Sequence, residues 1–161
     1  MRSASSPSAV ASCQAISTAP ELNAEAFDRD GYFLTGDLGS IAPDGRVRFR
    51  GRLKEMIKTG GVNVAPLEVE EVLLQHPDVV QAYVVGVADQ AKGEIVGAAV
   101  ELRAGAATDT ASIIAFCRER LASYKVPNQL AFRTAAQLPR TPTGKIHKPT
   151  LSRELAGHPD P

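Results

Sequence analysis

Apolar and polar positions follow strand-like patterns in the second half of the chain. Val79 to Val87 is nearly all apolar and β-branched apart from Gln81, which is typical of a strand buried on both faces. Ile95 to Leu102 is a second such run, and the short connection predicts that it pairs antiparallel with the first. Gln129 to Thr134 is expected to add a third strand.

Two other stretches show the period of amphipathic helices. The first runs from Pro66 to His76 and is stopped by Pro77. The second runs from Thr108 to Leu121, with Thr108 or Asp109 as its cap. Their apolar faces comprise Val69, Val72 and Leu73 in the first helix, and Ile113, Ile114, Cys117 and Leu121 in the second.

A β-hairpin is predicted upstream of these elements, over Ile41 to Arg50. Pro43-Asp44-Gly45 has the chemistry of a turn. Val47 and Phe49 alternate with arginines, so one face is apolar and the other solvated. The predicted fold class is therefore α+β: a small hairpin followed by a three-stranded core sheet packed with helices.

The two ends of the chain show neither period. Residues 1–19 are rich in Ser and Ala, and we expect a disordered or ill-defined tail there. Residues 156–161 are expected to form a second tail. Between the first tail and the hairpin, Pro20 to Phe27 favours a short helix.

Composition excludes several classes of protein. Lys+Arg and Asp+Glu are both 18, so the formal net charge is zero, which argues against binding nucleic acid through bulk charge. Cys13 and Cys117 are far apart and fit a reducing, cytoplasmic location. The three histidines are not clustered, so no metal site is expected. No apolar run approaches the length of a membrane span.

The stretch from Gly51 to Glu70 concentrates the candidate chemistry. Arg52, Lys54 and Lys58 precede the pair Gly60-Gly61, whose missing side chains permit a tight turn and the close approach of another molecule. Pro66 then starts a helix with carboxylates in its first turn, which suits the positive end of the helix dipole. The order is a basic segment, an open glycine turn and a helix start.

Two further motifs flank this stretch. Gly31-Tyr-Phe-Leu-Thr-Gly-Asp-Leu-Gly39 ends in an acidic tip at Asp37. Leu138-Pro-Arg-Thr-Pro-Thr-Gly-Lys-Ile146 is a proline-stiffened loop that carries Lys145. Taken singly, Asp37 is an ordinary turn residue and Lys145 an ordinary surface lysine. All three motifs together, in this order, resemble the acyl-adenylate-forming (AMP-binding) ligases over about Ala19 to Leu155, and most closely the acyl-CoA synthetases and fatty-acid–CoA ligases.

The resemblance implies roles for the residues before the glycine turn. Asp37 matches the family aspartate that binds both ribose hydroxyls, and a carboxylate has the acceptors for this. Arg52 matches the arginine that also contacts the nucleotide. Lys54 falls at the family's hinge between its large and small domains. Lysine is frequent there in acyl-CoA synthetases, whereas peptide-synthetase adenylation domains usually have aspartate.

The remaining roles concern the two half-reactions of the family. Lys145 matches the lysine that contacts the carboxylate substrate and the α-phosphate during adenylation. Lys58 matches a lysine implicated in thioester formation, in which Gly60 and Gly61 would admit CoA. His147 and Pro149 depart from the basic pair that often follows the family lysine, which puts the geometry beyond Lys145 in question.

The resemblance also implies a domain plan and a set of ligands. Residues 20–50 would end a large adenylating domain, and 51–155 would form the C-terminal lid. The phosphate loop and carboxylate pocket of that large domain are not encoded here. The chain is therefore expected to act with such a domain in cis or trans, on a carboxylic acid, ATP/AMP, Mg²⁺ and CoA, and not to be active alone.

Other classes of function stay open on the sequence. The chain could be a non-catalytic module that binds a partner, or a truncated gene product. It could also be part of a peptide-synthetase adenylation domain, although Lys54 argues against this. A small RNA-binding domain with Gly60-Gly61 as a phosphate clamp is disfavoured by the zero net charge and by the absence of a stacking aromatic pair.

Overall fold

The computed structural model describes residues 26–157, and it divides the chain into two compact units, Met1–Lys54 and Glu55–Pro161. The tails predicted for 1–19 and 156–161, and most of the helix predicted for Pro20 to Phe27, lie outside the described residues or at their edge. No helix among the described residues is long and apolar enough to cross a membrane.

The described part of the first unit is built on the predicted hairpin. β1 (Asp37–Ile41) pairs antiparallel with β2 (Val47–Arg52), and the register places Asp37 opposite Arg52. The hairpin is longer than predicted, because it begins at Asp37 rather than Ile41 and ends at Arg52 rather than Arg50. Before it, the Asp28 side chain accepts the backbone N–H groups of Asp30 and Tyr32.

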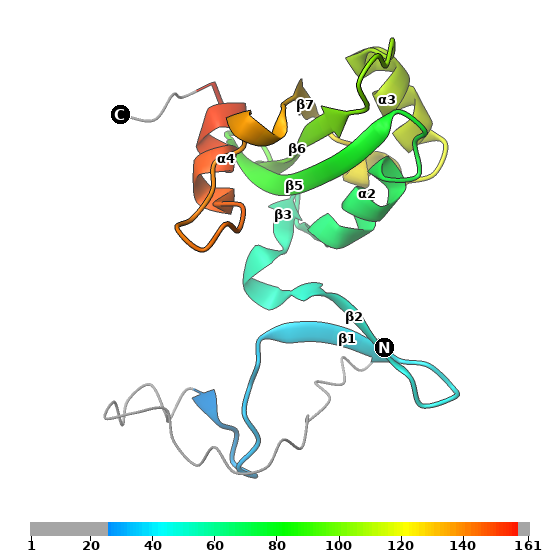
Figure 1. The fold of residues 1–161 in the computed structure, drawn as a ribbon. Coiled ribbons are helices and arrows are strands. Elements are labelled where there is room, and N and C mark those ends of the chain that lie inside the picture. The colour runs from blue at the N-terminus through cyan, green and yellow to red at the C-terminus, as the bar shows by residue number, and fades with distance from the viewer. Residues whose placement is uncertain (1–25, 158–161) are drawn as a thin grey trace. The chain divides into compact units, whose positions relative to one another are not determined.

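The second unit contains the core sheet and three helices (Figure 1). β5 (Val79–Asp89) and β6 (Gly93–Leu102) form the long antiparallel pair that the sequence predicts. β7 (Gln129–Phe132) pairs with β6 in parallel, because the chain between them crosses over through α3 (Thr110–Arg118). The α+β fold class is confirmed.

The sheet has two more strands than the three expected. β3 (Ile57–Thr59) and β4 (Val62–Val64) form a short hairpin that joins β6 through the pair Thr59–Gly93, so that the sheet has five strands. Strands of three residues carry too little periodicity to be recognised in a sequence. The hairpin matters because the two glycines of the central motif form its turn.

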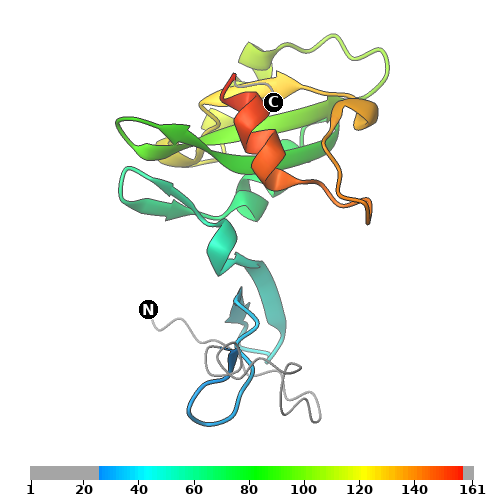
Figure 2. The ribbon, with the colours of Figure 1, turned by 90° about the vertical axis from the view of Figure 1, so that its left-hand side faces the viewer.

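Helices cover both faces of this sheet (Figure 2). One face packs α2 (Pro66–Leu73) and α3 against apolar side chains of β5 and β6. The other face packs α4 (Lys148–Leu155), whose Leu151 is fully buried. Successive residues of β5, such as Val84 and Val85, point to opposite faces of the sheet and enter different cores. This explains why the apolar run of β5 is nearly unbroken.

The two predicted helices form, but they are shorter than their patterns. α2 ends at Leu73 rather than His76. α3 begins after Asp109, whose side chain accepts the Ser112 N–H, so Asp109 rather than Thr108 is the cap. Val69, Leu73, Ile113 and Cys117 are buried as expected. Cys117 is a free cysteine in the core, and burial raises the pKa of its thiol.

Candidate functional site

The acidic and basic tips of the first hairpin form an ion pair. Asp37 starts β1 and Arg52 ends β2, and the Arg52 Nε lies 3.1 Å from Asp37 Oδ1. Oδ1 is buried, yet it accepts no hydrogen bond of good geometry from the described residues. A carboxylate oxygen in this condition can accept a hydroxyl donor of a ligand.

The candidate hinge occupies a turn of 3-10 helix, η1 (Leu53–Glu55). The Leu53 N–H donates to Gly36 O over 2.8 Å, which ties the start of η1 to the first unit. Lys54 is exposed and is the last residue of that unit, and Glu55 begins the second. The chain thus passes from one compact unit to the other within η1.

The glycine turn, Gly60–Gly61, connects β3 to β4. Gly60 has φ +55° and Gly61 has φ +81°, as a two-residue hairpin turn of type I′ requires. A Cβ added to either glycine would meet nothing within 4 Å. The space beside the turn is therefore open, and the positive φ values explain the glycines independently of any ligand.

Lys58 lies on the same hairpin as the glycine turn. Its side chain is exposed, and its backbone N–H donates to Glu94 Oε2 on β6 over 2.6 Å. The structure thus brings Lys58, Gly60 and Gly61 together on one short hairpin, as their spacing in the sequence suggested. An exposed ammonium beside an open turn can attract an anionic group of a ligand.

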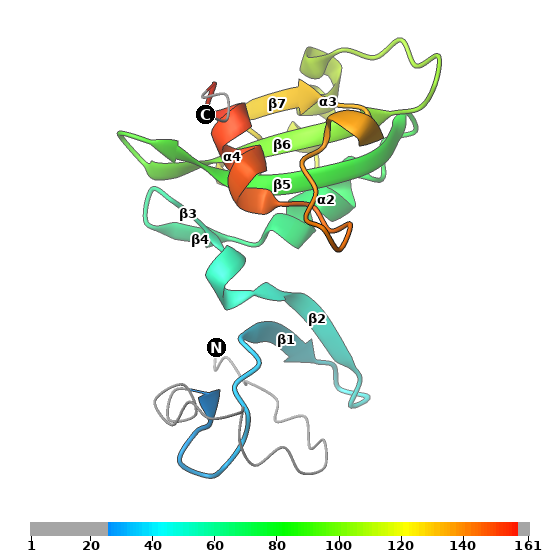
Figure 3. The same ribbon diagram turned by 60° about the vertical axis from the view of Figure 1, so that its left-hand side comes forward.

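Lys145 lies on the lysine loop, Pro139 to Ile146, which precedes α4 (Figure 3). Several hydrogen bonds hold the loop closed: Thr141 N–H donates to Lys145 O over 2.7 Å, and Arg140 donates to Gly144 O over 2.8 Å. Gly144 at the tip has φ +81°. The Lys145 side chain is exposed on this ordered support.

The segment after Lys145 forms a helix that the sequence did not predict. The Leu151 N–H donates to His147 O, and Pro149 occupies the first turn of α4, where a missing N–H is tolerated. The Ser152 hydroxyl donates to Gly86 O on β5. His147 and Pro149 are therefore compatible with an ordered support for Lys145.

A charged cluster joins Glu55 of η1, Glu70 of α2 and Lys148 at the start of α4. Lys148 Nζ lies 2.5 Å from Glu55 Oε2, and both charges act on Glu70. Burial raises the pKa of Glu70, and the repulsion of Glu55 adds to this rise. The hydrogen bond from Val84 N–H to Glu70 Oε1 and the attraction of Lys148 oppose it.

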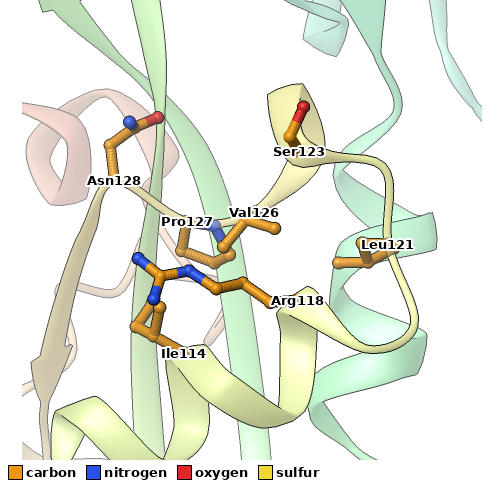
Figure 4. Close-up of a pocket in the computed structure, with 7 residues that line it drawn as sticks. All are labelled: Ile114, Arg118, Leu121, Ser123, Val126, Pro127 and Asn128. Atoms are coloured by element: carbon orange, nitrogen blue, oxygen red, sulfur yellow. The ribbon is translucent and has the colours of Figure 1, made fainter.

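A concave site of about 620 Å³ lies between α3 and the segment before β7 (Figure 4). Arg118 supplies a guanidinium among polar and apolar lining side chains in similar measure. Its lining residues are Ile114, Arg118, Leu121, Ser123, Val126, Pro127 and Asn128. None was predicted as a site residue, because Arg118 is an unremarkable surface arginine in the helical pattern.

The described residues contain no group of three or more His, Cys, Asp and Glu side chains that could hold a metal ion. Asp37 and Arg52 lie in the first unit, whereas Lys58, the glycine turn and Lys145 lie in the second. The roles assigned to these residues remain predictions.

The chain matches known proteins over most of its length. Residues 68–145 match the model of the AMP-binding enzyme C-terminal domain. This part of the chain belongs to that family. The chain is 45% identical over 130 residues to the sulfoacetate–CoA ligase of Cupriavidus necator, covering 81% of this chain and 25% of the relative.

Solved structures agree with the family assignment. ATP-bound MatB from Rhodopseudomonas palustris superposes with a TM-score of 0.77 at 37% identity, covering 85% of this chain and 27% of that one. The amide bond synthetase McbA from Marinactinospora thermotolerans gives a TM-score of 0.74 at 38% identity, covering 82% and 26%. The chain spans about a quarter of the length of these proteins and corresponds to their C-terminal part.

Proposed function

We propose that this chain is the C-terminal part of an ATP-dependent acyl-CoA synthetase. Working with a large adenylating domain in cis or trans, it would help to convert a carboxylic acid and ATP, with Mg²⁺, to an acyl-adenylate and pyrophosphate, and then to a CoA thioester. The observation that carries the proposal is the 45% identity to a CoA ligase over four-fifths of the chain. Similar proteins are named for different acids, such as sulfoacetate and oxalate, so the proposal takes carboxylic acids as a class.

In the first half-reaction, Asp37 and Arg52 would hold the nucleotide. Asp37 Oδ1 is a buried acceptor with no hydrogen bond from the described residues, and the ribose offers hydroxyl donors. Lys145 would place its ammonium against the negative charge that develops as the carboxylate attacks phosphorus. A charge donor that is aimed in advance lowers the barrier without reorganising during the reaction.

In the second half-reaction, the hairpin that carries Lys58 and the glycine turn would act in place of the lysine loop. A change in backbone angles at Lys54 would rotate this unit, as domain closures concentrate such changes in a few residues. The glycine turn would then admit the CoA thiol, and Lys58 would contribute its positive charge. The open space around Gly60 and Gly61 supports this step.

The test separates the half-reactions in an enzyme joined to a compatible large domain. Lys145→Ala should slow pyrophosphate release by about two to three powers of ten, the usual scale for removing an aimed charge donor. Thioester formation from preformed acyl-adenylate should change far less. Lys92→Ala, which removes another exposed lysine of the same unit, is the control for adenylation. Equal losses in both steps for Lys145→Ala would contradict the assigned role.

A second candidate function rests on the similarity to the amide bond synthetase. The adenylation residues would keep their roles, and an amine would replace CoA as the attacking group. Supplying the reconstituted enzyme with preformed acyl-adenylate and either CoA or a simple amine distinguishes the two. Faster consumption with the amine would favour amide formation. No turnover with any large domain, together with binding to one, would instead favour a non-catalytic module.

A further inference from the structure

The hairpin that carries Lys58 and the glycine turn makes few backbone hydrogen bonds to the rest of the sheet, although its Ile57 and Val64 side chains are buried in the core. β3 pairs with β6 through Thr59–Gly93 alone. One further backbone bond, from Gly60 N–H to Lys92 O over 3.0 Å, supports the turn. A strand held by so short a ladder depends on whatever side chains continue the pairing.

Glu94 continues this ladder with its side chain. Its Oε2 accepts the Lys58 N–H over 2.6 Å, a short bond of the charge-assisted kind. The donor is the backbone of Lys58, one residue before the Thr59–Gly93 pair. The carboxylate therefore substitutes for a backbone carbonyl that β6 does not present at this position.

Gly86 on β5 leaves the room that this carboxylate needs. A Cβ on Gly86 would lie 2.9 Å from Glu94 Cδ and 3.0 Å from both carboxylate oxygens. The φ of Gly86 is outside the left-handed region, so its backbone does not require glycine. The missing side chain is therefore explained by the space that Glu94 occupies.

We propose that Glu94 is a positioning residue that fixes the Lys58–Gly61 hairpin for the second half-reaction. The inference rests on the proposed function, because it assigns this hairpin to thioester formation. Glu94 acts through the Lys58 backbone and touches no reacting atom. Loss of the carboxylate frees the turn end of the hairpin to move, while the lysine loop keeps its own hydrogen bonds.

The first test uses the full chain and needs no activity. Glu94→Ala should speed hydrogen exchange at the Lys58 and Gly60 amides by about tenfold, the loss expected for one hydrogen bond. Glu94→Gln keeps an acceptor oxygen and should exchange within about twofold of the wild type. Glu101→Ala, near the other end of β6, is the matched control. Unchanged exchange in folded Glu94→Ala would overturn the proposal.

The second test measures both half-reactions in the reconstituted enzyme. Glu94→Ala should slow thioester formation about tenfold and leave adenylation within about twofold, and Glu94→Gln should restore most of the loss. Gly86→Ala pushes the carboxylate away while the residues of the hairpin and Glu94 itself stay unchanged, so it should reproduce the Glu94→Ala result even where that variant folds poorly. A Glu94→Gln variant as slow as Glu94→Ala would overturn the proposal, as would a Gly86→Ala variant with wild-type exchange and rates.

The two hypotheses fail in distinguishable ways. If Lys145→Ala keeps full adenylation, the proposed function is wrong, and the exchange results still decide whether Glu94 holds the hairpin. If Lys145→Ala loses adenylation as expected while Glu94→Ala slows both half-reactions equally, the proposed function stands and the positioning role is wrong.

Discussion

Gly61 shows how one residue can be constrained by its backbone and by its surroundings at once. Its φ of +81° disfavours every residue with a Cβ, whereas the space around that position is empty. A bulky substitution would therefore strain the turn by about 1–2 kcal/mol and also fill the open space. The two effects can be separated because a small side chain produces the first without the second.

Gly61→Leu should block thioester formation and spare adenylation, because leucine fills the path proposed for the CoA arm. Gly61→Ala is the control, since it carries the same backbone strain with little bulk. Single-turnover measurement of each half-reaction checks this in the reconstituted enzyme. If alanine and leucine are equally harmful to thioester formation, strain and not blockage explains the loss.

Glu70 should make stability depend on pH. Burial raises its pKa above the ordinary value of 4.5, so on raising the pH the unfolded chain loses this proton before the folded chain does. The contribution is therefore most favourable at acid pH and is lost as the pH rises through the raised pKa.

Glu70→Gln should remove this loss, because glutamine can still accept the Val84 N–H without carrying a charge. Its free energy of unfolding, relative to the wild type, should increase between about pH 4 and about pH 7. Urea unfolding at both values measures the difference. A variant whose relative stability falls over this interval would show that attraction to Lys148 outweighs burial.

At the scale of elements, α4 fits the sheet because β6 has no side chain at Gly97. A Cβ there would lie 2.5 Å from Val87 Cγ2 and 3.2 Å from Leu155 Cδ1. The φ of Gly97 lies outside the left-handed region, so only packing opposes a larger residue. The packing of α4, which supports the lysine loop, thus depends on a glycine on β6, far from α4 in the sequence.

Gly97→Ala should destabilise the second unit by about 1–3 kcal/mol, as overpacking of a well-filled core does. The double variant Gly97→Ala/Val87→Ala removes the atom in closest contact, so its loss should be smaller than the sum of the single losses. Thermal unfolding of the four proteins completes the cycle. Additive losses would show that the contact with Val87 is not the cause.

At the scale of the whole molecule, function would depend on movement between two compact units that meet within η1. Residues on either side of Lys54 are each held within their own unit. The Leu53 N–H donates to Gly36 O in the first unit, and the Glu55 carboxylate pairs with the Lys148 ammonium in the second. Lys54 lies between these two anchors. A rotation of one unit against the other would therefore concentrate its backbone changes at Lys54.

Lys54→Pro should trap one orientation, because proline fixes φ and also restricts Leu53 before it. We expect adenylation to survive and thioester formation to fall, since the adenylating arrangement must be left before CoA can react. Lys54→Ala leaves the backbone free and should do little. Rapid-quench measurement of each half-reaction decides this, and an alanine variant as impaired as the proline variant would implicate the lysine side chain.

The sequence by itself determined the features that depend on neighbouring residues. The apolar runs of β5 and β6 and the glycine turn follow from side-chain period and local backbone preference. The family resemblance was equally readable, because it rests on three short motifs whose order survives in the chain. These are properties of residues within a few positions of one another.

Only the tertiary structure decided the features that join distant residues. β3 and β4 are too short to show a period, and α4 begins at Lys148 with an unpromising Lys-Pro pair. Both form because packing against β5 and β6 stabilises them, which outweighs weak local preference. The bond from Lys58 to Glu94 spans 36 residues. The sequence names both partners, but only the folded sheet places them side by side.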